Sequence, residues 1–178
     1  MSIIQDGTGK SYGAKVDGTF RLYTDSRTSA NIFFVSRDNK QAYNSISTVA
    51  SAAAGEYVLY LKNDNAMDLF VEHIEYHSEQ SVRWKVWEVT GTASGGTITP
   101  SNVNLGSSNA AEVTCVGNQS ITGLTTVKQI GTHRTQAEGE GEMGFGGALI
   151  IPTSKAIAIE YDGGTTGDCE IDLFFYFQ

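Results

Sequence analysis

Apolar and polar residues alternate in short runs along most of this chain, as in β-strands whose two faces meet different surroundings. The clearest run is residues 169–177. One face of this run is apolar and is expected to be core: Cys169, Ile171, Leu173, Phe175 and Phe177. The other face begins acidic and ends aromatic, with Glu170, Asp172, Phe174 and Tyr176. We expect another element or another subunit to cover the aromatic end.

Eight further runs are rich in β-branched or aromatic residues and are bounded by turn-forming residues. They are residues 31–35, 56–62, 69–76, 82–90, 112–116, 125–130, 148–151 and 156–161. Helix signals are weak, since residues 49–54 offer only one or two turns without an apolar stripe. The Gly- and Glu-rich residues 138–147 are expected to be a solvated loop. The pattern predicts an all-β fold, namely an antiparallel two-sheet sandwich and, among sandwiches, a jelly roll.

The beginning of the chain suggests an extended arm rather than part of the sandwich. Residues 14–23 predict a hairpin, because a favoured Asp-Gly turn lies between alternating flanks. We therefore expect an N-terminal arm with this hairpin at 1–28 and a sandwich domain at 29–178. Glycines in such an arm let it lie extended and pair with a neighbouring chain through its backbone. Its candidate partner-binding residues are apolar: Ile3, Ile4, Val16, Phe20 and Leu22.

Acidic residues outnumber basic ones. The 178 residues include 20 Asp or Glu and 12 Lys or Arg, which gives a formal net charge of −8. Such a surface repels nucleic-acid phosphates, and no Lys/Arg cluster reverses the charge locally. The N-terminus has no signal-peptide pattern, and no apolar run approaches the length of a membrane span. We therefore expect no nucleic-acid partner, no membrane partner, and synthesis in the cytoplasm without a signal peptide.

Patterns that could hold a metal or a cofactor fail on spacing. His73, Glu75 and His77 share one face of an expected strand, but the two histidines stand about 13 Å apart there, too far to hold one ion. Residues 9–11, Gly-Lys-Ser, resemble the end of a phosphate-binding loop. That motif needs glycine where Ile4 stands and a helix afterwards. We therefore expect no metal and no cofactor.

The sequence offers no catalytic constellation either. No Gly-x-Ser-x-Gly elbow occurs, and no acid–base pair of carboxylates can be singled out, so we do not expect an enzyme. Trp84 and Trp87 are three apart and so face opposite sides of a strand; one is expected in the core, and the other could stack on a sugar or anchor an interface. Cys115 and Cys169 are expected to be buried thiols, although a disulfide between them stays open.

Several short segments resemble those of a group of virion structural proteins of tailed bacteriophages. In that group a short Asp-Gly-x-Gly segment and an Ala-Lys-Val hairpin precede a β-sandwich. Here the similar segments are DGTG at 6–9, AKVD at 14–17 and RL at 21–22, followed by residues 60–63, 104–109 and 148–159. The resemblance covers most of the chain and implies no catalytic residues. It implies attachment to a phage head or tail, often as a trimer, through the arm and the sandwich edges.

We therefore expect a virion structural protein, and first a head decoration or cement protein that attaches to the capsid and stabilises it on the outer surface of the phage head. Its partners would be the major capsid protein, or another virion protein, and further copies of itself. Phe174 and Tyr176 are the candidate oligomer interface, because large apolar surface is uncommon on a monomer; the homotrimer follows from the resemblance. The alternatives are a tail, fibre or spike module that binds a host-surface glycan and, last, a jelly-roll enzyme.

Overall fold

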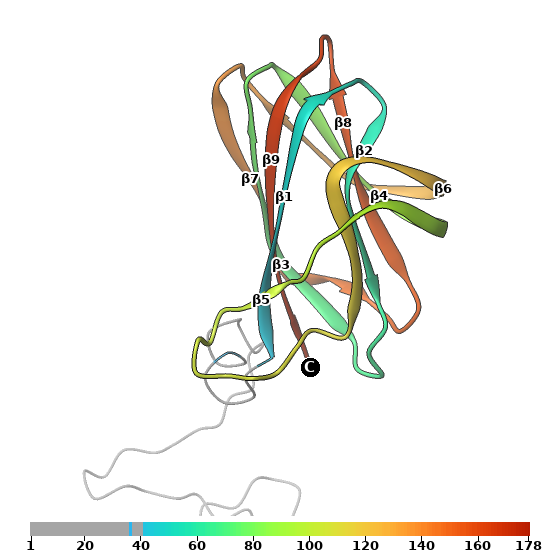
Figure 1. Ribbon diagram of the computed structural model, residues 1–178, viewed down its shortest axis with the longest axis vertical. Helices are drawn as coiled ribbons and strands as arrows, with labels where there is room; N and C mark the ends of the chain where they lie inside the picture. The colour runs from blue at the N-terminus through green and yellow to red at the C-terminus, as the bar shows by residue number, and fades with distance from the viewer. Residues whose placement is uncertain (1–35, 37–40) are drawn as a thin grey trace, which may run out of the picture.

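Nine β-strands make up the part of the chain that the structure describes, which is Ser36 and residues 41–178 of a computed structural model (Figure 1). They are β1 (Ala42–Ala52), β2 (Glu56–Asn63), β3 (Leu69–Ser78), β4 (Val82–Thr97), β5 (Ser101–Asn102), β6 (Val113–Thr135), β7 (Gly139–Ile151), β8 (Ala156–Gly163) and β9 (Gly167–Phe177). The arm expected at 1–28 and the strand expected at 31–35 lie outside the described residues. So do the partner-binding residues proposed for the arm: Ile3, Ile4, Val16, Phe20 and Leu22.

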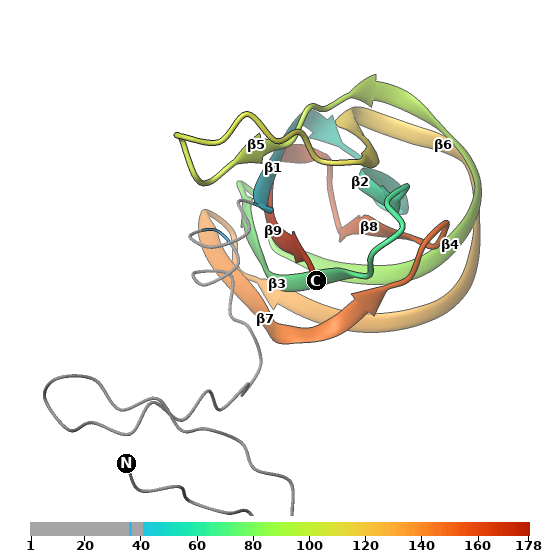
Figure 2. The same ribbon diagram turned by 90° about the horizontal axis from the view of Figure 1, so that it is seen from below.

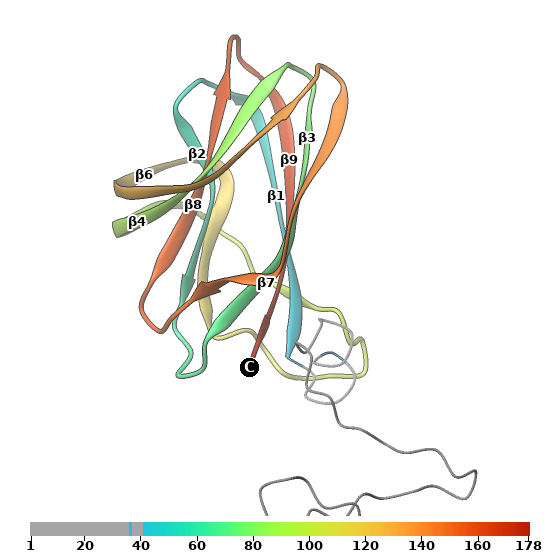
Figure 3. The same ribbon diagram turned by 180° about the vertical axis from the view of Figure 1, so that it is seen from behind.

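The strands form two antiparallel sheets that pack against each other (Figure 3). The first sheet has the order β5-β1-β9-β3-β7, and the second contains β2, β8, β4 and β6. Apart from the short β5, successive strands alternate between the two sheets except at β4 and β6, which are neighbours in the second sheet. The strand orders β1-β9-β3-β7 and β2-β8-β4-β6 are those of an eight-stranded jelly roll. The predicted antiparallel sandwich of jelly-roll type is confirmed.

The second sheet closes on itself because β6 has hydrogen-bonded partners on both of its sides. Its first residues pair with β2, and most of its length pairs with β4. Viewed from below, β4 and β6 are long curved strands that sweep around one side of the molecule (Figure 2). Where these two strands curve side by side, Gly91 and Gly123 have φ angles of 108° and 82°. A Cβ at either glycine would clash with a carbonyl oxygen of the facing strand, so the curve requires glycine there.

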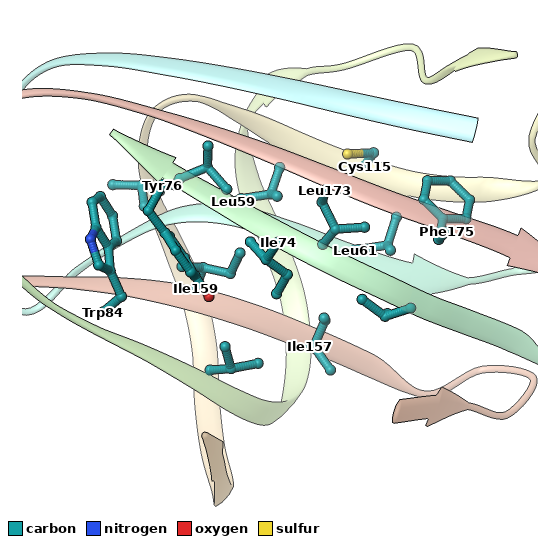
Figure 4. Packing of buried hydrophobic residues seen from close by; sticks show 14 of the residues in the cluster. Leu59, Leu61, Ile74, Tyr76, Trp84, Cys115, Ile157, Ile159, Leu173 and Phe175 are labelled. Atoms are coloured by element: carbon teal, nitrogen blue, oxygen red, sulfur yellow. The ribbon is translucent and has the colours of Figure 1, made fainter. Parts of the chain in front are cut away.

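The hydrophobic core lies between the sheets and contains the inward side chains of both (Figure 4). At one end Tyr76 of the first sheet stacks on Trp84 of the second, with ring centroids 5.0 Å apart. The indole Nε1 of Trp84 donates a hydrogen bond of 3.0 Å to Thr135 Oγ1, so its one polar group is satisfied. The core face predicted for the last strand is confirmed, since all five of its residues are buried: Cys169, Ile171, Leu173, Phe175 and Phe177.

Residues 49–54, the one stretch with weak helix signals, form no helix, in agreement with the predicted all-β fold: residues up to Ala52 belong to β1. Val49 pairs with Cys169 and Ala52 with Gly167, both on β9. Val49 and Ala52 are buried in the core. Backbone pairing and burial here outweigh the helix propensity of the alanines.

The expected loop at 138–147 is wrong, because from Gly139 onward it forms the edge strand β7, paired with β3. Its glycines allow close packing: a Cβ at Gly141 would clash with the imidazole of His133. Its glutamates point to water, as suits an edge strand. The two runs expected at 112–116 and 125–130 are parts of the one long strand β6.

Candidate docking face

The surface with the most distinctive chemistry is the outward side of the five-stranded sheet, which we call the outer face. Directly opposed residues on β1, β9, β3 and β7 align its side chains in rows across the strands. The four rows are Ala42–Tyr176–Phe70–Ile150, Asn44–Phe174–His73–Gly144, Ile46–Asp172–Glu75–Glu142 and Thr48–Glu170–His77–Glu140. We call the first two rows the aromatic half and the last two the acidic half. One sheet face therefore has two chemically different parts.

Two stacked ring pairs form the centre of the aromatic half. The rings of Tyr176 and Phe70 lie 5.3 Å apart with 6° between their planes. The imidazole of His73 stacks on Phe174 at 4.3 Å. Burial, with a smaller contribution from the charge of Glu72, raises the pKa of the Tyr176 hydroxyl, so that group stays neutral at physiological pH. Such stacks contribute roughly 0.5–1.5 kcal/mol beyond the area they bury, and they hold the rings in fixed positions.

The two residues proposed for an oligomer interface differ in how much surface they leave open. Tyr176 is only 2% exposed within a single chain, whereas Phe174 is half-buried. Tyr176 is thus buried within its own chain and needs no second copy for its burial, while Phe174 stays partly open. The homotrimer stays a prediction. In this region, the surface available for contact with another copy is that of Phe174 and Phe70.

The acidic half surrounds a shallow hollow of about 400 Å³ lined by side chains of β3, β7 and β9. The Oδ1 atom of Asp172 is buried in this region and has no hydrogen-bond partner in the described part of the chain. Burial is the main cause that raises the pKa of the Asp172 carboxyl, and the charges of Glu170 and Glu75 raise it further. These carboxylates therefore repel one another when all are ionised.

The residues considered for a metal site lie on the acidic half and next to it. His73, Glu75 and His77 share the outer face, as predicted, and His73 Nε2 lies 3.5 Å from Glu75 Oε1. The two histidines belong to rows that are not adjacent. Within residues 41–178 no group of three or more His, Cys, Asp and Glu side chains is arranged to hold a metal ion.

The two tryptophans face opposite sides of β4, as predicted. Trp84 is in the core, and Trp87 is half-buried on the outward side of the second sheet. The Nε1 of Trp87 donates a hydrogen bond of 2.7 Å to Glu160 Oε2, while Lys85 Nζ donates one of 2.8 Å to Glu160 Oε1. The bond to Glu160 is the main cause that raises the pKa of the Lys85 ammonium. The indole is thus held in a charged network within its own chain.

The cysteines are free thiols, and both are buried, as predicted. They belong to the core between the sheets. Burial raises the pKa of Cys115 to about 11 and that of Cys169 to about 12. Both thiols are therefore protonated at physiological pH, and neither has the exposed thiolate of a reactive cysteine.

Sequence reasoning identified the β9 part of the outer face and missed the β7 part. The period-two alternation of residues 169–177 predicted the acidic beginning and the aromatic end of that strand. The loop predicted for residues 138–147 includes Glu140 and Glu142, because this segment is rich in glycine. The signal that could have identified them is the strict alternation of Gly and Glu, which puts both glutamates on one side of a strand.

The described part of the chain contains no helix that is long and apolar enough to cross a bilayer. Comparison with models of protein families, with curated proteins and with solved structures gives no match. The function of the chain must therefore be inferred from its own residues and their geometry.

Proposed function

We propose that the chain is a structural protein of a phage virion, specifically a head decoration or cement protein that attaches to the capsid and stabilises it. The outer face is the observation that supports this proposal. It joins an aromatic half to an acidic half over four strands, so it offers apolar contact and charge together to a broad surface. The fold alone does not identify the function, because lectins and enzymes also have jelly-roll folds.

The proposed partner is the phage major capsid protein or another virion protein. A partner with basic and apolar patches would complement the two halves of the outer face, because like charges across an interface are unfavourable. The arm predicted at 1–28 gives a second point of attachment through its backbone and apolar residues. The sequence resemblance to phage virion proteins points to the same class. The acidic surface argues against nucleic acid as the partner.

Mass spectrometry of purified phage heads and purified tails from one lysate tests this proposal. The major capsid protein and a tail-tube protein serve as purity markers for the two fractions. We expect the chain in the head fraction, in a fixed ratio to the capsid protein. Its presence only in tails would overturn the head assignment and favour a tail, fibre or spike module. Its absence from both fractions would overturn the virion proposal altogether.

The alternative, glycan binding, rests on Trp87, whose ring is half-buried on the outward side of the second sheet. A sugar would stack on the ring face, because Nε1 is already bonded to Glu160. Trp87→Phe keeps an aromatic face, and Trp87→Ala removes it. Glycan binding that survives the first change and disappears with the second would favour this function over capsid decoration. Equal binding by all three proteins would exclude Trp87 as a sugar platform.

A further inference from the structure

Two arginines stand directly opposite each other on neighbouring strands of the second sheet, at the end where β8 turns into β9 (top of Figure 1). Arg83 of β4 pairs with Arg134 of β6, and both side chains are exposed on the outward side of that sheet. The Cβ atoms of such a pair lie about 5 Å apart, and like charges in this position lower stability. The pair therefore costs the folded chain some free energy unless an anion accompanies it.

No carboxylate in the described part of the chain forms an ion pair with either guanidinium group. Asp162 of β8 is the cross-strand neighbour of Arg83, but its Oδ2 lies 3.0 Å from Lys85 Nζ. The same ammonium group lies 2.8 Å from Glu160 Oε1. Both carboxylates beside the arginines are thus held by one lysine, and the charges of Arg83 and Arg134 stay without a partner there.

The two arginines line a hollow of about 310 Å³. Ser81 lines it as well, and because its hydroxyl donates a bond of 3.2 Å to Thr135 O, its oxygen can only accept from a ligand. Gly163 and Gly164 border the hollow without side chains that would fill it. One water molecule takes up about 30 Å³ of the liquid, so the hollow has room for an anionic group together with a polar body of several more atoms.

We propose that Arg83 and Arg134 form a binding site for an oxyanion group, such as a carboxylate or a phosphate ester, on a small polar ligand. The planar fork of N–H donors in a guanidinium group matches two oxygens of such a group, and the negative charge between the forks removes their repulsion. Asp162 lines the same hollow, so a singly charged carboxylate should bind more tightly than a doubly charged phosphate ester. This inference does not depend on the virion assignment.

NMR titration of the full-length, ¹⁵N-labelled protein at constant ionic strength tests the proposal. The probes are glucuronate, glucose 6-phosphate and glucose, which share a sugar ring and differ in the charged group. The backbone amide signals of Arg83, Arg134 and Gly164 report on the hollow. We expect saturable shifts with glucuronate, weaker binding of glucose 6-phosphate and no shift with glucose. Tighter binding of glucose 6-phosphate would support the oxyanion site and identify phosphate as its preferred group.

Two variants locate the site, and a third is their control. Arg83→Gln and Arg134→Gln should each weaken glucuronate binding about tenfold, since each removes a charge-assisted hydrogen bond. Lys128→Gln removes one exposed positive charge from β6 outside the hollow and should leave binding unchanged. A second measurement needs no ligand. Arg134→Gln should raise the melting temperature of the free protein by about 1 °C, because it removes the like-charge pair.

Three results would overturn the proposal. Shifts that do not saturate with either anion, or that glucose reproduces, would show that the arginines hold no oxyanion. Equal weakening by Lys128→Gln and Arg134→Gln would show that only the overall charge of the protein matters. A clear fall in the melting temperature of free Arg134→Gln would show that this guanidinium group already has a stabilising partner in the folded chain.

Discussion

The hydroxyl of Ser47 on β1 donates a hydrogen bond of 2.7 Å to the carbonyl oxygen of Val58 on β2, so a side chain of one sheet satisfies the backbone of the other. Val58 lies where the pairing register of β2 shifts, and it has no ladder partner on either side. The same hydroxyl oxygen accepts a bond of 2.9 Å from the backbone N–H of Asn118 on β6. Ser47 thus joins three strands at the closed side of the sandwich.

Ser47→Ala should lower the free energy of unfolding by about 1–3 kcal/mol, because it leaves a buried carbonyl without a donor. Urea unfolding followed by tryptophan fluorescence measures the change. Thr48→Ala is the matched control: the Thr48 hydroxyl is exposed and makes only a bond of 3.4 Å to Glu170. That variant should stay within about 0.5 kcal/mol of the unmodified protein. Equal losses for both variants would mean that the bonds of Ser47 contribute no more to stability than the exposed hydroxyl of Thr48 does.

Asp172→Asn should raise the melting temperature at pH 7 by about 1–2 °C, which corresponds to a surface charge effect of roughly 0.5 kcal/mol in a domain of this size. The pKa of Asp172 is raised in the folded state, mainly by burial and also by Glu170 and Glu75. The folded protein is therefore stabilised when Asp172 is protonated. This stabilisation is fully present below the pKa that Asp172 has in the unfolded chain, and it is lost as pH rises through its pKa in the folded protein. Differential scanning calorimetry across the acidic range measures this change.

The advantage of Asp172→Asn should shrink as pH falls into the range where Asp172 of the unmodified protein takes up a proton. Glu138→Gln, an exposed carboxylate in the turn before β7, is the control and should show no comparable gain. A melting temperature that falls at neutral pH would mean that the carboxylate has a stabilising partner instead.

The buried thiols should be unreactive in the folded protein. A thiol reagent at pH 8 should label neither Cys115 nor Cys169 until urea unfolds the chain, when both should react at once. Their pKa values of about 11 and about 12 lie above the ordinary thiol value. Their contribution to stability is therefore fully present below the unfolded thiol pKa and is lost as pH rises through the folded values.

The unfolding midpoint in urea should accordingly fall between pH 8 and pH 11. With Cys115 and Cys169 both changed to Ala, the urea midpoint should fall less steeply between pH 8 and pH 11. The cavities left by the smaller side chains should lower stability at every pH. Labelling of either thiol in the native protein at pH 8 would contradict the buried, protonated state.

Deletion of residues 1–27 should leave a folded sandwich that no longer attaches to its particle. The described strands from β1 onward bury their own apolar faces, so circular dichroism and melting should change little. Attachment is measured by sedimentation with particles that lack the protein. Lys10→Ala should bind normally, whereas Val16→Pro should not, because proline removes a backbone donor from the predicted hairpin. Normal decoration by the truncated protein would assign attachment to the sandwich alone.

How much of this fold the sequence predicts depends on whether each strand has a clear alternation of apolar and polar residues of its own. The alternation of Phe175 and Phe177 with Glu170 and Asp172 is local, so it identified both faces of β9. The run predicted at 148–151 is the end of β7, but the first part of this strand escaped prediction because its glycines are required by side chains of other strands, as at Gly141 beside His133 of β6. The rows of the outer face depend on the strand order β1-β9-β3-β7, which no local pattern contains. The burial of Tyr176 on that face likewise could not be predicted from its own strand.

The closed pairing of β2, β8, β4 and β6 has a consequence for how long the fold survives. A strand at the edge of a sheet, such as β7, can separate after a single ladder of hydrogen bonds breaks. Among the described strands, β2 and β8 have hydrogen-bonded partners on both sides, so the departure of either requires two ladders to rupture together. Partial openings of this kind are the ones that proteases and slow unfolding use. The first sheet can thus gain or lose edge strands. We expect the second sheet to open slowly and therefore to limit the unfolding rate of the domain.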